Sequence, residues 1–245
     1  MKKIIGHRPV IEALRSNSKL ERVYILDTLR GPIEKEVRHL CKEKKVVLSR
    51  IPQAKLDREV RGNHQGVFAL ASLVDYLLLE DLIPYLFDKG KNPLLLILDS
   101  IKDVRNIGAI ARSAEVFGVD GLILPAKKGG QINEVTIKAS AGALTKIPVC
   151  RVPTTNMAVE YLKQSGFQVV GAMMGAPLRV AELEIDQPTV IILGSEGTGI
   201  DRNLIPVLDL IFSIPQIGQL DSLNVSVAAG IILYELSKQR QEKKS

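Results

Sequence analysis

The sequence predicts an α/β protein in which a small α/β segment precedes a larger domain built on a parallel sheet. From Pro93 onward, short apolar runs without polar alternation are separated by helical patterns, which is typical of a parallel sheet covered on both faces. The first 75 residues also alternate between β-like and helical patterns, but they differ in charge. Hydrophobic residues make up 46% of the 245 residues and charged residues 24%, which excludes a disordered or collagen-like chain.

The expected elements of the first segment are short. We expect strands at Val23–Leu26, Val46–Leu48 and Gln65–Leu70, with helices at Pro9–Ser16, Pro32–Lys44 and Gln53–Val60. Residues 76–93 have a mixed pattern and are interpreted as a linker. The domains are therefore expected at 1–75 and 94–245.

In the larger domain, strands and helices should alternate. The expected strands are Leu94–Asp99, Gly121–Pro125, Ile147–Val152, Gln168–Ala172, Thr189–Gly194 and Leu210–Ile214. The expected helices are Ile107–Phe117, Glu134–Leu144, Met157–Ser165, Arg202–Val207 and Leu223–Gln239. Ligands of such sheets bind beyond the carboxyl ends of the strands, so the informative residues should follow strands.

Charge is unevenly distributed. Residues 1–75 carry a net charge of +7, whereas residues 76–245 carry −1. A basic segment beside a neutral one favours a module that binds a polyanion, with a solvated basic surface as the alternative. All three histidines (His7, His39 and His64) lie in this first segment, so a reaction in the larger domain must proceed without a histidine base.

Several protein classes are excluded. The apolar runs are far shorter than a membrane helix, and the chain starts with no signal-peptide pattern. Two cysteines, Cys41 and Cys150, exclude a disulfide scaffold and a zinc site built from C-x-x-C pairs. We therefore expect a soluble cytoplasmic protein without a metal.

The first candidate loop follows the strand Leu94–Asp99 and carries Asn106 and Arg112. Asn106 could cap the following helix, which would by itself explain that residue. Arg112 is the only charge between Asn106 and Glu115. A guanidinium among apolar residues favours an anionic partner, which could be a ligand or an internal carboxylate such as Glu196.

The second candidate loop is glycine-rich and follows the strand Thr189–Leu193. It reads Gly194-Ser195-Glu196-Gly197-Thr198-Gly199-Ile200. The pattern is neither a P-loop nor a dinucleotide fingerprint, and an ordinary tight turn remains the alternative. Because Glu196 would repel a phosphate, the turn is better suited to a cationic or amide-bearing ligand.

The third candidate loop leads from Ile214 into an apolar helix. Ser222 or Asp221 could cap this helix. Ser222, Asn224 and Ser226 place three small hydrogen-bonding groups at its start, more than capping requires, which indicates the lining of a polar site.

Together the three loops, N-x-G-x-x-x-R, G-S-E-G-x-G and S-L-N-V-S-x-A, resemble the motifs of the SpoU (TrmH-like) RNA ribose 2′-O-methyltransferases of the SPOUT superfamily. The resemblance covers about Pro93 to Gln239. The first segment resembles the L30e/L7Ae-like RNA-binding domain of the branch that methylates a guanosine of 23S ribosomal RNA, through Gly6-His7 with Val10-x-Glu12-Ala13-Leu14 and through Asn63–Val67.

The resemblance implies a deep trefoil knot, S-adenosylmethionine as the cofactor and a homodimer whose site uses both chains. Carried over by position, the cofactor-binding residues are Gly194, Ser195, Gly199, Ile214 and Leu223, and the catalytic residues are Asn106, Arg112, Glu196, Ser222 and Asn224. Candidate RNA contacts in the first segment are Arg8, Arg61, His64 and Gln65. A structural turn is the alternative for His64 and Gln65, and a structural role is likewise the alternative for Arg8 and Arg61.

Two alternative functions stay open. One is the same reaction on transfer RNA, whose enzymes typically lack the first domain. The other is a non-catalytic RNA-binding factor of ribosome assembly that retained the fold.

Overall fold

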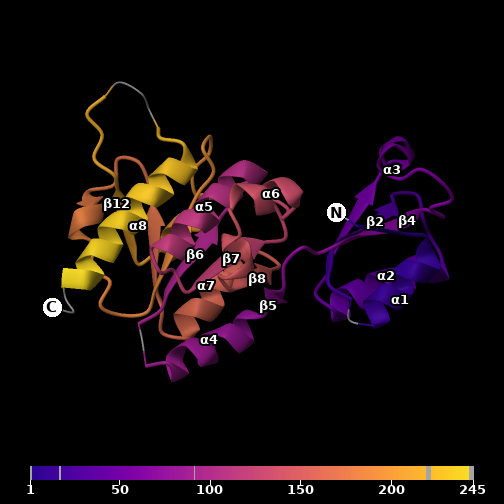
Figure 1. The fold of residues 1–245 in the computed structure, drawn as a ribbon, viewed down its shortest axis with the longest axis horizontal. Coiled ribbons are helices and arrows are strands. Elements are labelled where there is room, and N and C mark those ends of the chain that lie inside the picture. Colours follow the sequence, from indigo (N-terminus) through magenta and orange to yellow (C-terminus); the bar gives the residue numbers. More distant parts are fainter. Residues whose placement is uncertain (1, 17, 91, 219–221, 243–245) are drawn as a thin grey trace. The chain divides into compact units, whose positions relative to one another are not determined.

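The computed structural model describes residues 2–16, 18–90, 92–218 and 222–242. The chain divides into two compact units (Figure 1). The first comprises the residues up to Val74 together with Ile132–Glu134, and the second comprises Asp75–Gln131 and the residues from Val135 onward. Each unit has its own sheet and its own buried core, so each is described by itself.

The first unit is a four-stranded sheet in the order β1-β4-β2-β3. Its strands are β1 (Lys3–Ile5), β2 (Leu20–Leu26), β3 (Val47–Ile51) and β4 (Val67–Ala71), and its helices are α1 (His7–Arg15), α2 (Pro32–Glu43) and α3 (Gln53–Glu59). Strand β2 pairs parallel with β3 and antiparallel with β4, which in turn pairs antiparallel with β1. Strand β1 was not expected from the sequence.

Each face of this sheet has its own apolar cluster. On one face, α1 and α2 bury Val10, Leu14 and Val37 against the strands. On the other face, Leu56 of α3 packs in a cluster with Phe68, and Phe68 stacks on Tyr24 with ring centroids 4.7 Å apart. Side chains along a strand alternate between the two faces of the sheet, and helices cover both faces. Even this small unit therefore forms two apolar clusters.

The second unit is built on an eight-stranded sheet in the order β10-β12-β9-β11-β6-β7-β8-β5. Every neighbouring pair in it is parallel. The strands are β5 (Tyr76–Leu77), β6 (Leu94–Leu98), β7 (Gly121–Pro125), β8 (Val149–Val152), β9 (Gln168–Ala172), β10 (Leu178–Arg179), β11 (Thr189–Leu193) and β12 (Leu210–Ser213). The predicted parallel α/β sheet is confirmed.

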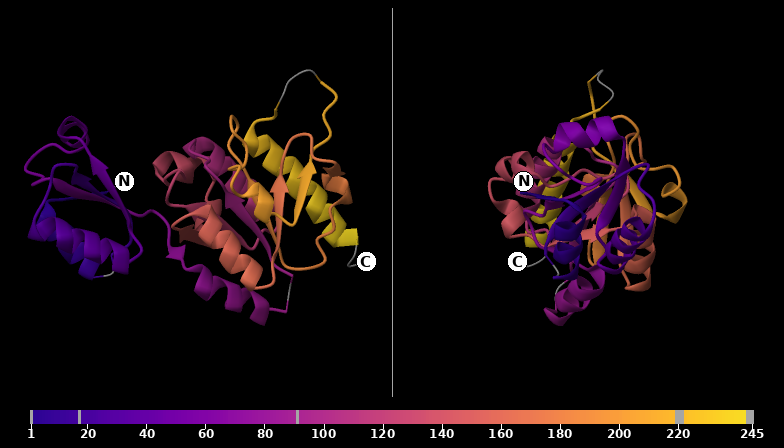
Figure 2. Two further views of the ribbon diagram at one scale, coloured as in Figure 1. Left: turned by 180° about the vertical axis from the view of Figure 1, so that it is seen from behind. Right: turned by 90° about the vertical axis from the view of Figure 1, so that its right-hand side faces the viewer.

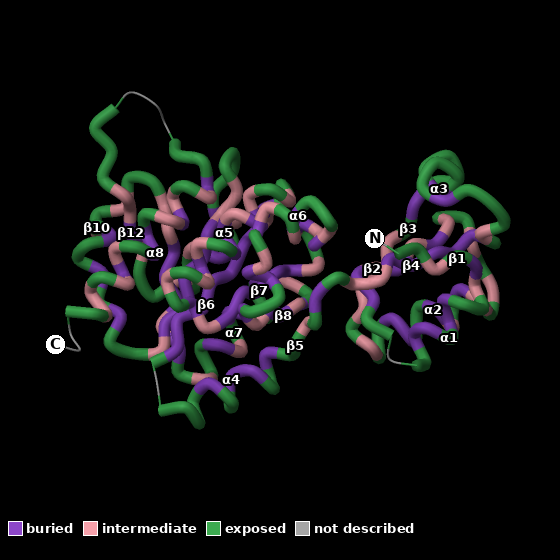
Figure 3. The backbone as a smooth tube through the Cα atoms, viewed as in Figure 1, coloured by how far each residue is buried: buried purple, intermediate pink, exposed green. Residues whose placement is uncertain are grey.

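Helices cover both faces of this sheet, as Figures 1 and 2 show. The helices α4 (Leu79–Asp88) and α7 (Thr155–Gln164) contribute to one core cluster together with β6, β9 and β11. The helices α5 (Val104–Val116) and α8 (Val225–Glu242) pack against each other, and α6 (Glu134–Ala139) lies nearby. All five residues of β6 and of β11 are buried, so the core follows the centre of the sheet (Figure 3).

The segment 76–93 was expected to be a linker, and the structure differs. It contains β5 and α4, and Leu79, Leu82, Ile83 and Leu86 of α4 are buried in the core cluster of the second unit. Those positions follow the spacing of one helix face, which joins the segment to the sheet.

Three expected helices also differ from the structure. Only Ile205–Val207 of the expected helix Arg202–Val207 is helical, as a 3₁₀ turn. The expected helix Glu134–Leu144 stops at Ala139, and a separate 3₁₀ turn, Ala143–Thr145, follows Gly142, whose φ is 86°. Helix α8 begins at Val225 rather than Leu223.

Candidate active site

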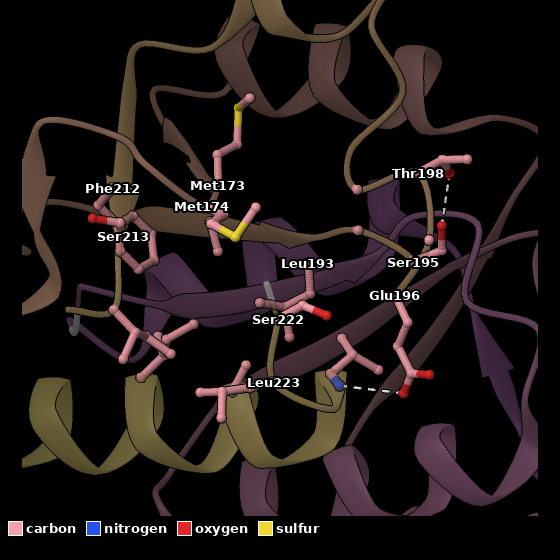
Figure 4. A pocket seen from close by; sticks show the side chains of 18 of the residues that line it. Met173, Met174, Leu193, Ser195, Glu196, Thr198, Phe212, Ser213, Ser222 and Leu223 are labelled. Atoms are coloured by element: carbon pink, nitrogen blue, oxygen red, sulfur yellow. Dashed lines mark hydrogen bonds between the residues drawn. The ribbon is translucent and has the colours of Figure 1, made fainter. Parts of the chain in front are cut away.

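A pocket opens at the carboxyl ends of β9, β11 and β12 (Figure 4). It lies beside β6, from which later strands are added on both sides of the sheet, and ligands of parallel sheets bind at such a point. Its volume is about 330 Å³. The pocket is lined by the ends of the three strands, by the glycine-rich turn after β11 and by the start of α8; the lining residues include Ala172, Met173, Leu193, Phe212, Ser213, Ile214, Ser222, Leu223, Ala228 and Ile232.

The glycine-rich turn after β11 forms one wall of the pocket. The amide of Ser195 donates to the carbonyl of Gly199 across 3.1 Å, and the amide of Gly199 donates back across 2.9 Å. The hydroxyls of Ser195 and Thr198 lie 2.8 Å apart. A Cβ atom on Gly194 would lie 2.1 Å from the carbonyl carbon of Gly199, so only glycine permits this closure. The turn therefore closes tightly on itself at the wall of the pocket.

Glu196, at the tip of this turn, joins three segments that are distant in the sequence. Its Oε1 accepts hydrogen bonds from the side-chain amides of Asn106 (2.8 Å) and Asn224 (2.6 Å). The backbone amide of Val225 lies 3.4 Å from the same oxygen. Figure 4 shows Glu196 pointing toward the start of α8. One carboxylate thus holds the glycine turn, α5 and α8 together. Its partners are amides of the chain itself, whereas the sequence had led us to expect a cationic or amide-bearing ligand.

The helix caps differ from the expectation. Asp103, not Asn106, caps α5, because its carboxylate accepts from the amide of Arg105 across 2.8 Å. Asn106 is thereby free to bind Glu196. At α8 the Oδ1 of Asn224 accepts from the backbone amide of Ser226 across 2.9 Å, so Asn224 rather than Ser222 satisfies the helix start. Asp221, the other expected cap, lies outside the described residues.

All five residues that the sequence assigned to the cofactor line this pocket: Gly194, Ser195, Gly199, Ile214 and Leu223. Of the catalytic candidates, Glu196 and Ser222 line it too. Asn106 and Asn224 are not among the lining residues, but both donate a hydrogen bond to Glu196, which is. The sequence analysis missed Met173, Phe212 and Ala228, whose only signal was their position at strand ends or in the first turns of a helix.

Arg112 does not join this cluster within one chain. It lies six residues after Asn106 on α5, is exposed, and forms no ion pair with any residue that the structure describes. Six residues amount to about 240° around a helix, so the two side chains leave α5 on different faces. The ion pair between Arg112 and Glu196, an open alternative in the sequence, is absent among the described residues.

Asp99 is a buried carboxylate that supports the turn and that the sequence analysis did not select. Only 4% of it is exposed. Its Oδ1 accepts from the hydroxyl of Thr155 across 2.6 Å, and its Oδ2 accepts from the amide of Asp201 across 3.0 Å. Asp99, which directly follows β6, thus connects Asp201, just after the glycine-rich turn, to Thr155 at the start of α7. A signal existed, because Asp99 directly follows an apolar strand.

Two of the RNA-contact candidates in the first unit, Arg8 and Gln65, lie at the start of α1. Arg8 and Arg61 are exposed, as is Gln65, whose φ is 51°. A Cβ atom on Gly6 would lie 3.4 Å from the Gln65 Oε1, which places Gln65 beside the first turn of α1.

His64 has bonds at both ring nitrogens. Its Nδ1 accepts from the amide of Gly66 across 3.0 Å, and its Nε2 lies 2.8 Å from the carboxylate of Asp57. These bonds indicate a structural role in the turn.

Two absences apply to the described part of the chain. None of its helices combines the length and the apolar character that crossing a bilayer requires. Nor do its His, Cys, Asp and Glu side chains gather in a group of three or more suited to a metal ion.

Comparison with known proteins identifies the family. The model of the SpoU rRNA Methylase family matches residues 93–234, which include the turn, Asn106, Arg112 and Asn224. The chain belongs to this family. A second model, described as RNA 2′-O ribose methyltransferase substrate binding, matches residues 3–77 and thus the first unit of this SpoU methylase. The SpoU methylase is accordingly an RNA 2′-O-methyltransferase with an N-terminal substrate-binding domain.

Individual relatives agree. The SpoU methylase is 34% identical over 238 residues to YacO of Bacillus subtilis, named as a TrmH family tRNA/rRNA methyltransferase, with 97% of this chain and 95% of the relative covered. Among solved structures, the A. aeolicus TrmH/SpoU tRNA modifying enzyme is 30% identical, with a TM-score of 0.54 over 69% of this chain and 87% of that one.

A further structure shares the fold over nearly the whole length of this SpoU methylase. The SpoU methyltransferase AviRb from Streptomyces viridochromogenes, solved in complex with AdoMet, superposes with a TM-score of 0.63 at 23% identity. The match covers 98% of this chain and 90% of that one.

Proposed function

We propose that this protein transfers a methyl group from S-adenosylmethionine to the 2′-hydroxyl of a guanosine ribose in 23S ribosomal RNA. The observation that carries the proposal is the Glu196 carboxylate, which binds Asn106 and Asn224 beside a glycine turn that lines a pocket. The neighbouring structure with bound AdoMet and the family match support the cofactor and the reaction class.

The pocket residues fit S-adenosylmethionine. The apolar wall formed by Leu193, Phe212 and Ile232 suits an adenine ring, and the turn closed by Gly194 and Gly199 offers backbone groups that a larger side chain would cover. When bound, S-adenosylmethionine supplies an electrophilic methyl group on its sulfonium.

The chain's own residues position the ribose. Because Glu196 fixes the amides of Asn106 and Asn224, these side chains have defined orientations at the mouth of the pocket. Correct placement of the attacking oxygen is worth roughly 7–11 kcal/mol of the barrier in favourable cases. Methyl transfer to the positioned oxygen would leave S-adenosylhomocysteine, and the hydroxyl proton would pass to solvent water.

Arg112 serves as an anion-binding group. A guanidinium is a poor base, so Arg112 grips a nucleotide phosphate and stabilises the developing alkoxide. The second unit contains no histidine that could do so instead.

The active form is a homodimer in which Arg112 enters the partner's site. Val227, Ile231 and Tyr234 are 39–58% exposed and recur at one-turn spacing on α8, forming an apolar stripe. Val116, 65% exposed, lies one turn after Arg112 on the adjacent α5. A second copy that covers this stripe would bring Arg112 to a pocket whose described lining residues in one chain include no Lys or Arg.

Ribosomal RNA is proposed as the substrate because residues 1–75 carry a net charge of +7 and residues 3–77 match a substrate-binding domain. We also propose that the first unit has an L30e-like fold and that the second unit contains a trefoil knot. The proposed location is the cytoplasm, where the RNA resides.

Transfer RNA is the second candidate substrate, since the relatives' names include tRNA/rRNA and tRNA modifying enzymes. A non-catalytic assembly factor is disfavoured, because the residues around Glu196 are intact.

The test is a comparison of 2′-O-methyl sites in RNA from a wild-type and a deletion strain, followed by transfer of labelled methyl groups in vitro. We expect one guanosine of 23S RNA to lose its methyl group and the purified protein to restore it. Loss from a tRNA instead would establish the second candidate, and unchanged maps with no cofactor binding in calorimetry would reject the proposal.

A further inference from the structure

Asp99 contacts both ends of the glycine-rich turn that lines the pocket. Its backbone amide donates to the carbonyl of Leu193, directly before the turn, across 2.8 Å. Its side-chain Oδ2 accepts from the amide of Asp201, directly after the turn, across 3.0 Å. Residues 194–200 are thus enclosed between two hydrogen bonds to a single residue.

Apolar packing fixes only the ends of this turn. Leu193 and Ile200 are 2% and 3% exposed, whereas residues 196–199 between them are exposed to solvent. The glycines of the turn also give its backbone more freedom than other residues would. The shape of the turn must therefore come from hydrogen bonds, which are the backbone pair between Ser195 and Gly199 inside it and the two bonds to Asp99 at its ends.

The side chain of Asp99 is itself held in one orientation. Its Oδ1 accepts from the hydroxyl of Thr155, the first residue of α7, across 2.6 Å. Asp99 is 4% exposed and Thr155 is 6% exposed, so water does not compete for this bond. A buried carboxylate costs free energy unless its oxygens are hydrogen-bonded, and here each oxygen has a donor. With Oδ1 bound to Thr155, Oδ2 is directed to the Asp201 amide.

The other contacts of Asp201 constrain the end of the turn less. Its carboxylate pairs with Lys128 across 2.8 Å and accepts from the amide of Asn203 across 3.1 Å. The Lys128 side chain is 61% exposed, and exposed ion pairs contribute little to stability. The buried bond to Asp99 is therefore the stronger constraint on this end of the turn.

We propose that Asp99 and Thr155 are positioning residues that hold the glycine turn in its binding conformation before the methyl donor arrives, and that they thereby set the affinity for S-adenosylmethionine. The inference rests on the proposed function. When only a fraction of the protein has the binding conformation, the apparent affinity falls by that fraction. Bound donor selects the same conformation, so the rate at saturating donor stays nearly constant.

The experiment compares wild type with four full-length variants: Asp99→Leu, Asp99→Asn, Thr155→Val and Thr189→Val. Leucine removes both acceptors of Asp99 at similar volume. Asparagine keeps two bonds, because its oxygen accepts from the Asp201 amide while its amide donates to the Thr155 hydroxyl, which can rotate to accept. Thr189→Val is the matched control: Thr189 is 1% exposed, lies at the opposite end of β11 and donates to the carbonyl of Gln187 across 2.8 Å.

Calorimetry measures the Kd for S-adenosylmethionine, and labelled methyl transfer to RNA from the deletion strain gives kcat and the KM for the donor. Thermal unfolding without donor gives Tm. We expect Kd and KM to rise about tenfold in Asp99→Leu and about threefold in Thr155→Val, with kcat within about twofold of wild type. Asp99→Asn should keep the wild-type Kd. Thr189→Val should lower Tm and leave Kd unchanged.

A wild-type Kd in Asp99→Leu and Thr155→Val, with Tm lowered as in Thr189→Val, would overturn the inference, because the two residues would then serve stability alone. A fall in kcat with KM unchanged would overturn it too, as would an Asp99→Asn variant that binds the donor as weakly as Asp99→Leu. If Asp99→Leu does not fold, the Kd of Thr155→Val decides. A wild type that binds no S-adenosylmethionine and transfers no methyl group would instead reject the proposed function.

Discussion

The side-chain amide of Asn224 donates to the Glu196 carboxylate across 2.6 Å. The same oxygen accepts from Asn106, which precedes Glu196 by 90 residues. Glu196 satisfies both amides at once, so the geometry of the site depends on one carboxylate. Removing it leaves two amides without their shared acceptor at the mouth of the pocket.

We expect Glu196→Ala to lower methyl transfer by about 10–100-fold, which corresponds to the loss of one bond to a charged group, roughly 1.5–3 kcal/mol, because the freed amides regain bonds to water. Glu196→Gln keeps an acceptor oxygen and should lose less. Transfer of labelled methyl groups measures both, and Glu184→Ala, at an exposed carboxylate away from the turn, serves as the control. An alanine variant with wild-type rate would show that the carboxylate does not organise the site.

Gly194 and Gly197 form a matched pair in one turn. A Cβ on Gly194 meets backbone 2.1 Å away, whereas a Cβ on Gly197 meets nothing within 4 Å. We therefore expect Gly194→Ala to destabilise the protein by about 3 kcal/mol and to abolish cofactor binding, while Gly197→Ala has little effect on either. Thermal unfolding and calorimetry with S-adenosylmethionine provide the measurements. Equal behaviour of the two variants would contradict the turn geometry.

Arg112→Ala should abolish methyl transfer while cofactor affinity changes little, because Arg112 lies outside the pocket of its own chain. If the partner supplies Arg112, mixing Arg112→Ala with Asn106→Ala subunits restores one complete site in each mixed dimer, about a quarter of wild-type activity. Activity of the mixed sample and its mass by light scattering test this. No recovery from dimers that do mix would place Arg112 in the site of its own chain.

Cys41 and Cys150 should be unreactive in the native protein. They are 2% and 0% exposed, and burial raises the pKa of each thiol to about 12. Reaction with a disulfide reagent at pH 8 should be slow until denaturant is added, when both thiols react.

The same two thiols predict how stability changes in alkali. Burial disfavours the thiolates in the folded state, so the thiols of the unfolded chain ionise first, from about pH 9. The free energy of unfolding should therefore fall as the pH rises from about 9 toward 12. Cys→Ser variants should reduce this dependence. Rapid thiol reaction without denaturant would show that one of these regions opens in the native state.

Most strands and the turn could be predicted because their signals are local. The apolar runs of β6 and β11 are five residues long and wholly buried, and the glycine turn directly follows β11. Helix α4 was missed although Leu79, Leu82, Ile83 and Leu86 have helical spacing, since acidic residues and Pro84 obscured the pattern. The cap of α5 was misplaced because Asp103 and Asn106 are both good caps in sequence.

The sequence by itself determined the parallel α/β class, the basic first unit and the three segments that carry polar groups, because these depend on local apolar patterns and composition. Only the tertiary structure decided that Glu196 binds the two asparagines, that Asp99 supports the turn and that Arg112 is exposed and not among the lining residues of its own chain's pocket. Such partners meet through sheet order and helix rotation, and these depend on packing between segments far apart in the chain.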